Sequence, residues 1–151
     1  MSQETLQLVF LLDAQRYALY VRVVERVVHA AAITPLPKAP EIVLGVINLE
    51  GKLIPVLDIR KRFNLPQRSL RTSDQFVIAR TASRHVALLV DNVVNVTDRD
   101  NGEIIPADDI VDGVSYISGI VKDREGLVLI HDLDTFLSIE EESQLDNALE
   151  S

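Results

Sequence analysis

The sequence predicts a mainly β fold in which two small barrels, each of about five short strands, share an apolar seam and carry short helices. Short runs rich in Val, Ile and Leu alternate with Gly, Pro and Asp turn signals, a pattern typical of strands. The order of these runs repeats in the second half of the chain. Each half is too small to bury a deep core alone, so the halves are expected to pack on each other.

The chain begins with a predicted hairpin, a bent strand and a stiff loop. Residues 6–12 and 17–21 are apolar runs on either side of the polar turn 13–16, so they are expected to pair. Residues 21–28 are rich in valine but interrupted by charged side chains, which favours a bent or bulged strand. Three prolines make residues 34–40 an extended loop, because each proline fixes φ and removes a donor.

A strand, a tight turn and a second strand come next. Residues 42–47 and 53–57 are apolar, and the turn between them contains Gly51, which supplies the positive φ that a tight turn requires. Asp58 follows the second strand at once and is expected to cap a short helix at residues 59–63.

The second half repeats this order of elements. Gly45 and Asp58 recur as Gly119 and Asp132 at the same spacing, which indicates an internal repeat. Asp132 is expected to cap a helix at residues 133–137. The strands expected in this half are residues 75–79, 85–90, 93–96, 116–121 and 127–130.

Because the two copies are expected to share a core, we predict a single domain over residues 1–151. Within it, one subdomain is expected at about residues 6–65 and a second at about 75–137. An acidic C-terminal tail follows at residues 140–151.

Charge is distributed unevenly along the chain. The 15 basic and 23 acidic residues give a formal net charge of −8, which argues against a nucleic-acid partner or an anionic membrane surface. Residues 140–151 contain acids and no bases, whereas residues 59–73 contain bases and no acids. Such segments are usually solvated faces; the alternative is that one of them contacts a partner or the other.

Residues that carry chemistry are scarce. The absence of cysteine excludes disulfides and thiolate ligands and favours a cytoplasmic protein. The histidines are far apart, and motifs for a nucleophilic serine or a phosphate loop are missing, so we expect no cofactor, no metal site and no enzymatic activity. Asp58 and Asp132 invite comparison with the paired acids of aspartic proteases, but the bulky residues that follow them favour helix caps. The N-terminal residues and the short apolar runs predict neither a signal peptide nor a membrane span.

The most specific stretch is residues 45–60, which read Gly-Val-Ile-Asn-Leu-Glu-Gly-Lys-Leu-Ile-Pro-Val-Leu-Asp-Ile-Arg. This stretch resembles the CheW family of chemotaxis coupling proteins, in which an Asn-Leu-x-Gly turn precedes Ile-Pro-Val-Leu-Asp-Ile-Arg. Residues 116–119, Tyr-Ile-Ser-Gly, support the resemblance in the second copy, and the match extends over roughly residues 8–137.

The resemblance implies that the two five-stranded barrels are SH3-like and that the chain is a cytoplasmic, non-enzymatic adaptor. The partners that it implies are the regulatory domain of a CheA-type histidine kinase and the cytoplasmic tip of a chemoreceptor. An adaptor for another output, such as pilus-based motility, is one alternative. A barrel that binds a small ligand is the alternative from another class of protein.

The residues expected to contact partners are Val24, Arg26, Gly45, Asn48, Glu50, Gly51 and Arg60. Two of them reverse the usual charge of the family, which has an acidic residue in place of Arg26 and an arginine in place of Glu50. Because the two reversals are opposite in sign, we hypothesise that Arg26 and Glu50 form an ion pair within about 6 Å of each other.

The same positions have structural alternatives. Gly45 and Gly51 are expected chiefly to serve backbone geometry, and Asn48 to bond either the local backbone or a partner. Val24 is either core or part of an exposed apolar groove, and Arg60 is expected on the surface of its helix.

The tail is expected to begin with a helix. Residues 138–141 read Ser-Ile-Glu-Glu, a capping box, and Leu145 and Leu149 lie one turn apart on one face. This short amphipathic helix either docks on the body or frays, and fraying is the commoner behaviour of chain ends.

Overall fold

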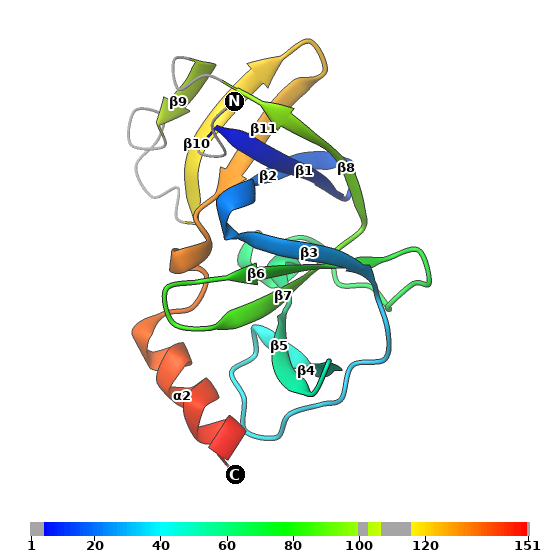
Figure 1. Ribbon diagram of the computed structural model, residues 1–151, viewed down its shortest axis with the longest axis vertical. Coiled ribbons are helices and arrows are strands. Elements are labelled where there is room, and N and C mark those ends of the chain that lie inside the picture. The colour runs from blue at the N-terminus through cyan, green and yellow to red at the C-terminus, as the bar shows by residue number, and fades with distance from the viewer. Residues whose placement is uncertain (1–4, 100–102, 107–115, 151) are drawn as a thin grey trace.

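The computed structural model describes residues 5–99, 103–106 and 116–150, which form two β-sheets arranged one above the other along the long axis of the molecule (Figure 1). The prediction of a mainly β fold with two sheet units is confirmed. None of the helices in these residues is long and apolar enough to span a bilayer.

The first sheet has six strands in the spatial order β8 (Asn92–Asp98), β1 (Leu6–Leu12), β2 (Gln15–Tyr20), β11 (Gly126–His131), β10 (Ile117–Asp123) and β9 (Ile104–Pro106). The second has five, in the order β3 (Val24–His29), β6 (Gln75–Arg80), β7 (His85–Val90), β5 (Lys52–Leu57) and β4 (Val43–Leu49). The helical elements are η1 (Val21–Val23), α1 (Ile59–Arg62), η4 (Leu133–Thr135) and α2 (Ile139–Glu150).

The internal repeat is visible in the strand order. The order β3-β6-β7-β5-β4 corresponds, strand for strand, to β8-β1-β2-β11-β10, and each sheet has its parallel pair at the same place, β5 with β7 and β2 with β11. The short strand β9 extends the six-stranded sheet beyond the five strands predicted for it.

The two copies of the repeat exchange their first hairpins. β1 and β2 pair with β8 and β11 from the second half of the chain, while β6 and β7 pair with β3 and β5 from the first half. The predicted subdomain boundaries at 6–65 and 75–137 are therefore wrong. The five-stranded sheet is the uninterrupted stretch 24–90, and the six-stranded sheet combines residues 6–20 with strands that follow residue 91. A repeat in the sequence predicts the order of strands within each copy. It does not show whether the first hairpin of a copy pairs with strands of its own copy or of the other copy.

The largest apolar core lies between the two sheets, as the predicted seam requires. β1 directs Leu8 and Phe10 into this shared core and Val9 into the six-stranded barrel. β7 likewise directs Leu88 into the shared core and Ala87 into the five-stranded barrel. These strands are buried on both faces, which explains why they read as continuous apolar runs rather than as alternating ones.

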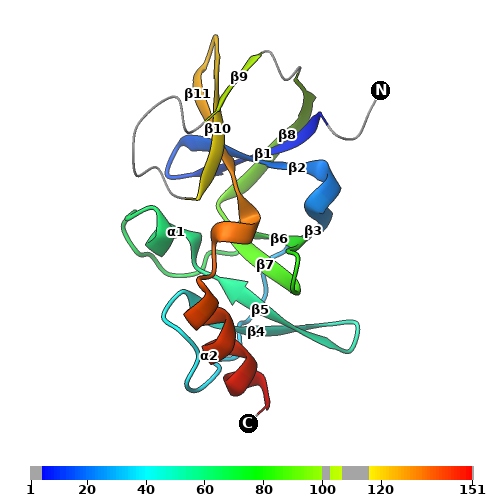
Figure 2. The same cartoon turned by 90° about the vertical axis from the view of Figure 1, so that its left-hand side faces the viewer.

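The C-terminal helix α2 docks beside the five-stranded sheet instead of fraying (Figures 1 and 2). Its predicted capping box is confirmed, because the Ser138 amide donates to the Glu141 carboxylate at 2.9 Å and the Glu141 amide donates to the Ser138 hydroxyl at 3.0 Å. Leu145 is fully buried in the shared core. An ion pair between Arg62 and Glu141 joins the basic segment 59–73 to the acidic tail. The alternative that one of these charged segments contacts the other is therefore confirmed.

The two predicted caps differ. Asp58 caps α1, since its carboxylate accepts from the Arg60 amide at 3.1 Å. Asp132 makes no such side-chain bond, and the element after it is the single 3-10 turn η4 rather than a longer helix.

Candidate functional site

The residues expected to contact partners lie mostly around one strand, β3. This strand is an edge of the five-stranded sheet, and η1 leads into it from the six-stranded sheet. The pairing register with β6 shifts between Val24 and Arg26, so the predicted bulged strand is confirmed. We use the name β3 surface for Val24, Arg26, Asn48, Glu50 and Gly51, of which the last three lie at the turn between β4 and β5.

Arg26 and Glu50 form the hypothesised ion pair. Their side-chain atoms Nη1 and Oε1 lie 3.2 Å apart, as do Nη2 and Oε2, and both side chains are exposed. The hydrogen bond from Arg26 lowers the pKa of the Glu50 carboxyl, and the same bond raises the pKa of Arg26. The pair links β3 to the β4–β5 turn and displays both charges to solvent.

The turn that carries Glu50 is a tight two-residue loop. Glu50 and Gly51 have φ values of 53° and 86°, and positive φ at both central positions is the pattern of a type I′ hairpin turn. The Asn48 carboxamide oxygen accepts from the Gly51 amide at 2.9 Å, so Asn48 holds the turn while its side chain stays exposed. The backbone of this turn therefore fixes where the Glu50 carboxylate points.

A second pair extends the charged surface. Nε2 of His85, in β7, lies 2.6 Å from the Glu25 carboxylate of β3. A small pocket next to both pairs is lined by Glu25, Arg26, Leu49, Glu50, Lys52, Ile54 and His85. Glu25 and His85 were not among the predicted contact residues, because their contact depends on the exchanged hairpin that places β7 next but one to β3.

Val24 is half-buried and packs against the shared core, as do the neighbouring valines of η1. On the adjoining strand β8, Val96 is 53% exposed and lies opposite Leu8 of β1, the strand against which η1 packs. Of the two alternatives for Val24, the core position is confirmed in part, because the half-buried side chain packs against the shared core. Apolar and polar residues alternate in the second half of β8, and this pattern could have drawn attention to Val96.

Gly45 is buried and does not belong to the β3 surface. Its backbone has a φ of 153°, and a Cβ atom there would collide with the carbonyl oxygen of Thr34, where the proline-rich loop crosses β4. Thr34 and Val46 exchange backbone hydrogen bonds at this crossing, of 2.9 and 2.8 Å. Gly45 therefore serves backbone geometry, which was the alternative given for it.

The prediction that Arg60 lies on the helix surface is wrong. The residue is 7% exposed, and its guanidinium bonds the carboxylates of Asp91 at 2.7 and 2.9 Å and of Asp13 at 2.8 Å. Asp13 is in the β1–β2 turn and Asp91 is in the link from β7 to β8, so Arg60 ties the five-stranded sheet to the six-stranded one. A helix of four residues is too short for its sequence to indicate which face is buried.

Arg68 completes this buried network by bonding Asp91 and Asp74. Burial alone would raise the pKa of Asp91, but bonds from the Asp13 amide, Arg60 and Arg68 together hold that pKa below its usual range. We use the name junction network for Asp13, Arg60, Arg68, Asp74 and Asp91. These ion pairs join the two sheets; Arg60 and Asp74 are buried, whereas Asp13 is exposed at the edge of the network.

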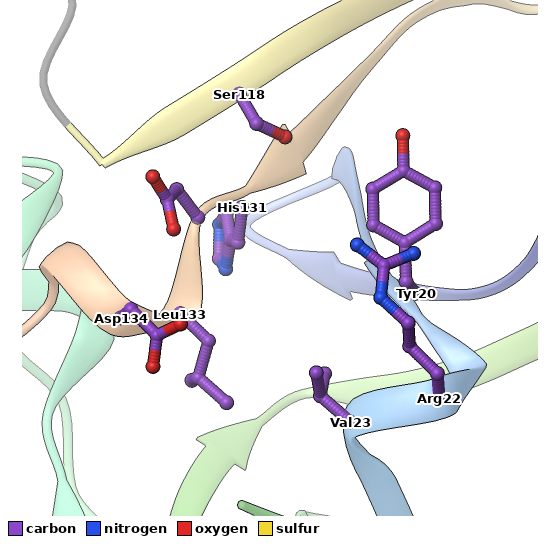
Figure 3. A pocket seen from close by; sticks show the side chains of 8 residues that line it. Tyr20, Arg22, Val23, Ser118, His131, Leu133 and Asp134 are labelled. Carbon is purple, nitrogen blue, oxygen red and sulfur yellow. The ribbon is translucent and has the colours of Figure 1, made fainter. Parts of the chain in front are cut away.

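A pocket between the sheets lies beside η1 (Figure 3). Arg22 and Tyr20 line one side, with the guanidinium 4.3 Å from the centre of the Tyr20 ring, and Leu133 and Asp134 line the other. His131 lies between them, is 3% exposed, and has a pKa lowered to about 3 by burial. In residues 5–99, 103–106 and 116–150, no group of three or more His, Cys, Asp or Glu side chains is placed to hold a metal ion.

Comparison with known proteins agrees with these features. The family model described as CheW-like domain matches residues 7–141. The chain is 26% identical to chemotaxis protein CheW of Treponema pallidum over 97% of this chain and 90% of the relative, and 32% identical to that of Bacillus subtilis over 88% and 86%. The crystal structure of the scaffolding protein TtCheW from Thermoanaerobacter tengcongensis superposes with a TM-score of 0.82 at 29% identity, covering 91% of this chain and 95% of that one.

The match includes the sheet-to-sheet arrangement as well as the sequence, so each sheet is an SH3-like barrel. The family model, over residues 7–141, covers the β3 surface and the junction network alike. The chain belongs to the CheW-like domain family.

Proposed function

We propose that this chain is a non-enzymatic cytoplasmic adaptor that couples a chemoreceptor-like protein to a CheA-type histidine kinase in chemotaxis. The match of the CheW-like domain over residues 7–141 carries the proposal, because it spans both barrels and the seam between them. The partners in this proposal are the regulatory domain of the kinase and the cytoplasmic tip of the receptor.

The β3 surface is the proposed receptor contact. Edge strands and rigid turns offer binding groups without any reactive side chain, which suits a protein that works by bringing others together. Here the turn backbone fixes Glu50, and Glu50 in turn fixes Arg26 at 3.2 Å. Gly45 and Arg60 are not part of the proposed contact, because both are buried.

Binding assays with purified proteins test the proposal. The chain is expected to bind a CheA regulatory domain in a pulldown at micromolar concentration, and a receptor-tip fragment in a separate assay. Failure to bind any CheA regulatory domain would defeat the adaptor function.

Substitutions on the β3 surface separate the receptor contact from the kinase contact. Asn48→Ala is expected to weaken receptor binding, because it releases the turn that positions Glu50. Arg71→Ala removes an exposed cation in the 63–74 loop and is the matched control. Val24→Asp is expected to weaken receptor binding and also to lower the melting temperature, since Val24 packs on the shared core.

A further inference from the structure

A second pocket, with a space of about 290 Å³, opens on the six-stranded sheet between β8 and the β10–β11 turn. None of the residues that line it belongs to the β3 surface or the junction network. We use the name β8 pocket for it. The lining includes the polar or charged residues Arg16, Thr97, Arg99, Asp123 and Arg124 and the apolar residue Val94.

Two residues that line the β8 pocket, Thr97 and Arg99, each have a polar side-chain atom that is buried and unpaired. Neither the Thr97 hydroxyl nor Nε of Arg99 has a hydrogen-bond partner among the described residues. Folded proteins pair nearly all such groups, because an unpaired buried donor keeps the full cost of losing water. Both groups can donate, so an acceptor oxygen in the pocket would satisfy them.

Positive charge exceeds negative charge around the pocket. Arg16 and Arg99 share one carboxylate, that of Asp123, with nitrogen–oxygen distances of 2.5, 2.9 and 3.1 Å. Arg124 makes no ion pair within the described part of the chain, and the Glu125 carboxylate lies 3.7 Å from Arg16. Three guanidinium groups therefore face two carboxylates, in a chain whose formal net charge is −8.

Asp123 stays ionised beside these arginines. The hydrogen bond from Arg16, with further bonds from the Glu125 amide and Arg99, holds the pKa of Asp123 far below its usual range. The ionised Asp123 carboxylate therefore holds Arg16 and Arg99 in fixed positions at the wall of the pocket. Val94, which is 45% exposed, adds an apolar wall.

We propose that the β8 pocket binds a carboxylate group on a short apolar stem, carried either by a glutamate side chain of a partner protein or by a free dicarboxylic acid. The Thr97 hydroxyl and Nε of Arg99 donate to the carboxylate, Arg124 supplies the remaining charge, and Val94 contacts the stem. A space of about 290 Å³ lies just below the usual range for ligand pockets, so it has room for one such group. The proposal does not depend on the adaptor function.

Nuclear magnetic resonance of the full chain, labelled with ¹⁵N, tests the proposal through the Nε–H signal of Arg99. Succinate is one probe, and a short peptide with a single glutamate is the other. The Arg99 signal is expected to shift and saturate. Saturation by succinate assigns a free acid as ligand, and saturation by the peptide alone assigns a partner side chain.

Thr97→Val is the decisive variant, because it removes the hydroxyl and keeps the shape of the side chain. It is expected to weaken binding about tenfold or more, the usual effect of losing a hydrogen bond to a charged group. The melting temperature is expected to stay the same or rise, since this hydroxyl has no partner among the described residues in the free chain. Arg124→Gln is expected to weaken binding severalfold, and the exposed Arg71→Gln is the charge-matched control. An unshifted Arg99 signal with both probes, or equal binding by Thr97→Val, overturns the proposal.

Discussion

The junction network and the β3 surface both contain arginine–carboxylate pairs, and they differ in burial. Arg60 is 7% exposed and bonds two carboxylates from separate parts of the fold. Arg26 and Glu50 have side chains that are 42% and 74% exposed and bond only across one surface. A buried charge that loses its partner stays uncompensated, whereas an exposed one is compensated by water. The same chemistry therefore holds the two barrels together at the junction and remains available for recognition at β3.

Breaking the junction network is expected to have the largest effect. Arg60→Met keeps the volume of the side chain but leaves Asp13 and Asp91 without their shared cation, so the free energy of unfolding is expected to fall by about 3–5 kcal/mol. Equilibrium unfolding in urea measures this change in the free energy of unfolding.

The neighbouring Lys61→Met is the control for Arg60→Met. The Lys61 ammonium is exposed and, among the residues that the structure describes, donates only to the Glu41 carbonyl oxygen, at 3.0 Å. Its loss is expected to change the free energy of unfolding by less than about 0.5 kcal/mol. Equal stabilities of the two variants would contradict the division between junction and surface.

The second largest effect is expected from acid, through His131 beside the junction. Its ring stacks on Phe63 with centroids 4.7 Å apart and stays neutral in the fold, with a pKa of about 3 against an ordinary value of 6.5. The unfolded chain takes up a proton below pH 6.5 and the folded chain does not, so stability is full above pH 6.5 and falls as the pH drops toward 3. Between pH 7 and pH 4 this loss amounts to about 3 kcal/mol.

His131→Leu isolates this effect, because every other side chain is the same in both proteins. As the pH falls from 7 to 4, the free energy of unfolding of His131→Leu is expected to rise relative to that of the natural chain by about 3 kcal/mol. A constant difference over that range would show that His131 does not titrate between the folded and unfolded states.

An intermediate effect is expected at α2, where a half-buried and an exposed carboxylate meet an enclosed cation. Arg84 is 14% exposed and bonds Glu142 at 2.7 Å and also Asp146. Arg84→Gln is expected to lower the free energy of unfolding by about 1 kcal/mol, because both partners regain water. Hydrogen exchange at Leu145 should quicken more than exchange in β7. Unchanged exchange at Leu145 would mean that apolar burial alone docks the helix.

Local features of the fold could be predicted from the sequence, whereas long-range ones could not. The Asp58 cap and the capping box at residues 138–141 depend on neighbours in the chain, and both were predicted correctly. The exchange of hairpins depends on pairings between strands far apart in sequence, which two similar copies leave undetermined. Arg60 was misplaced for the same reason, because its carboxylate partners lie 31 or more residues away.

The smallest effect on stability is expected on the β3 surface. Arg26→Glu places two like charges side by side, and Arg26→Glu with Glu50→Arg restores the pair with reversed polarity. Neither is expected to shift the melting temperature measurably, since water reaches both side chains. Receptor binding should respond instead: the single change is expected to abolish it, and the double change to select receptor tips of complementary charge, as a pulldown with paired tips would show. If the double variant bound the same tips as the natural chain, the polarity of the pair would carry no recognition, and the contrast with Arg60→Met would reduce to burial alone.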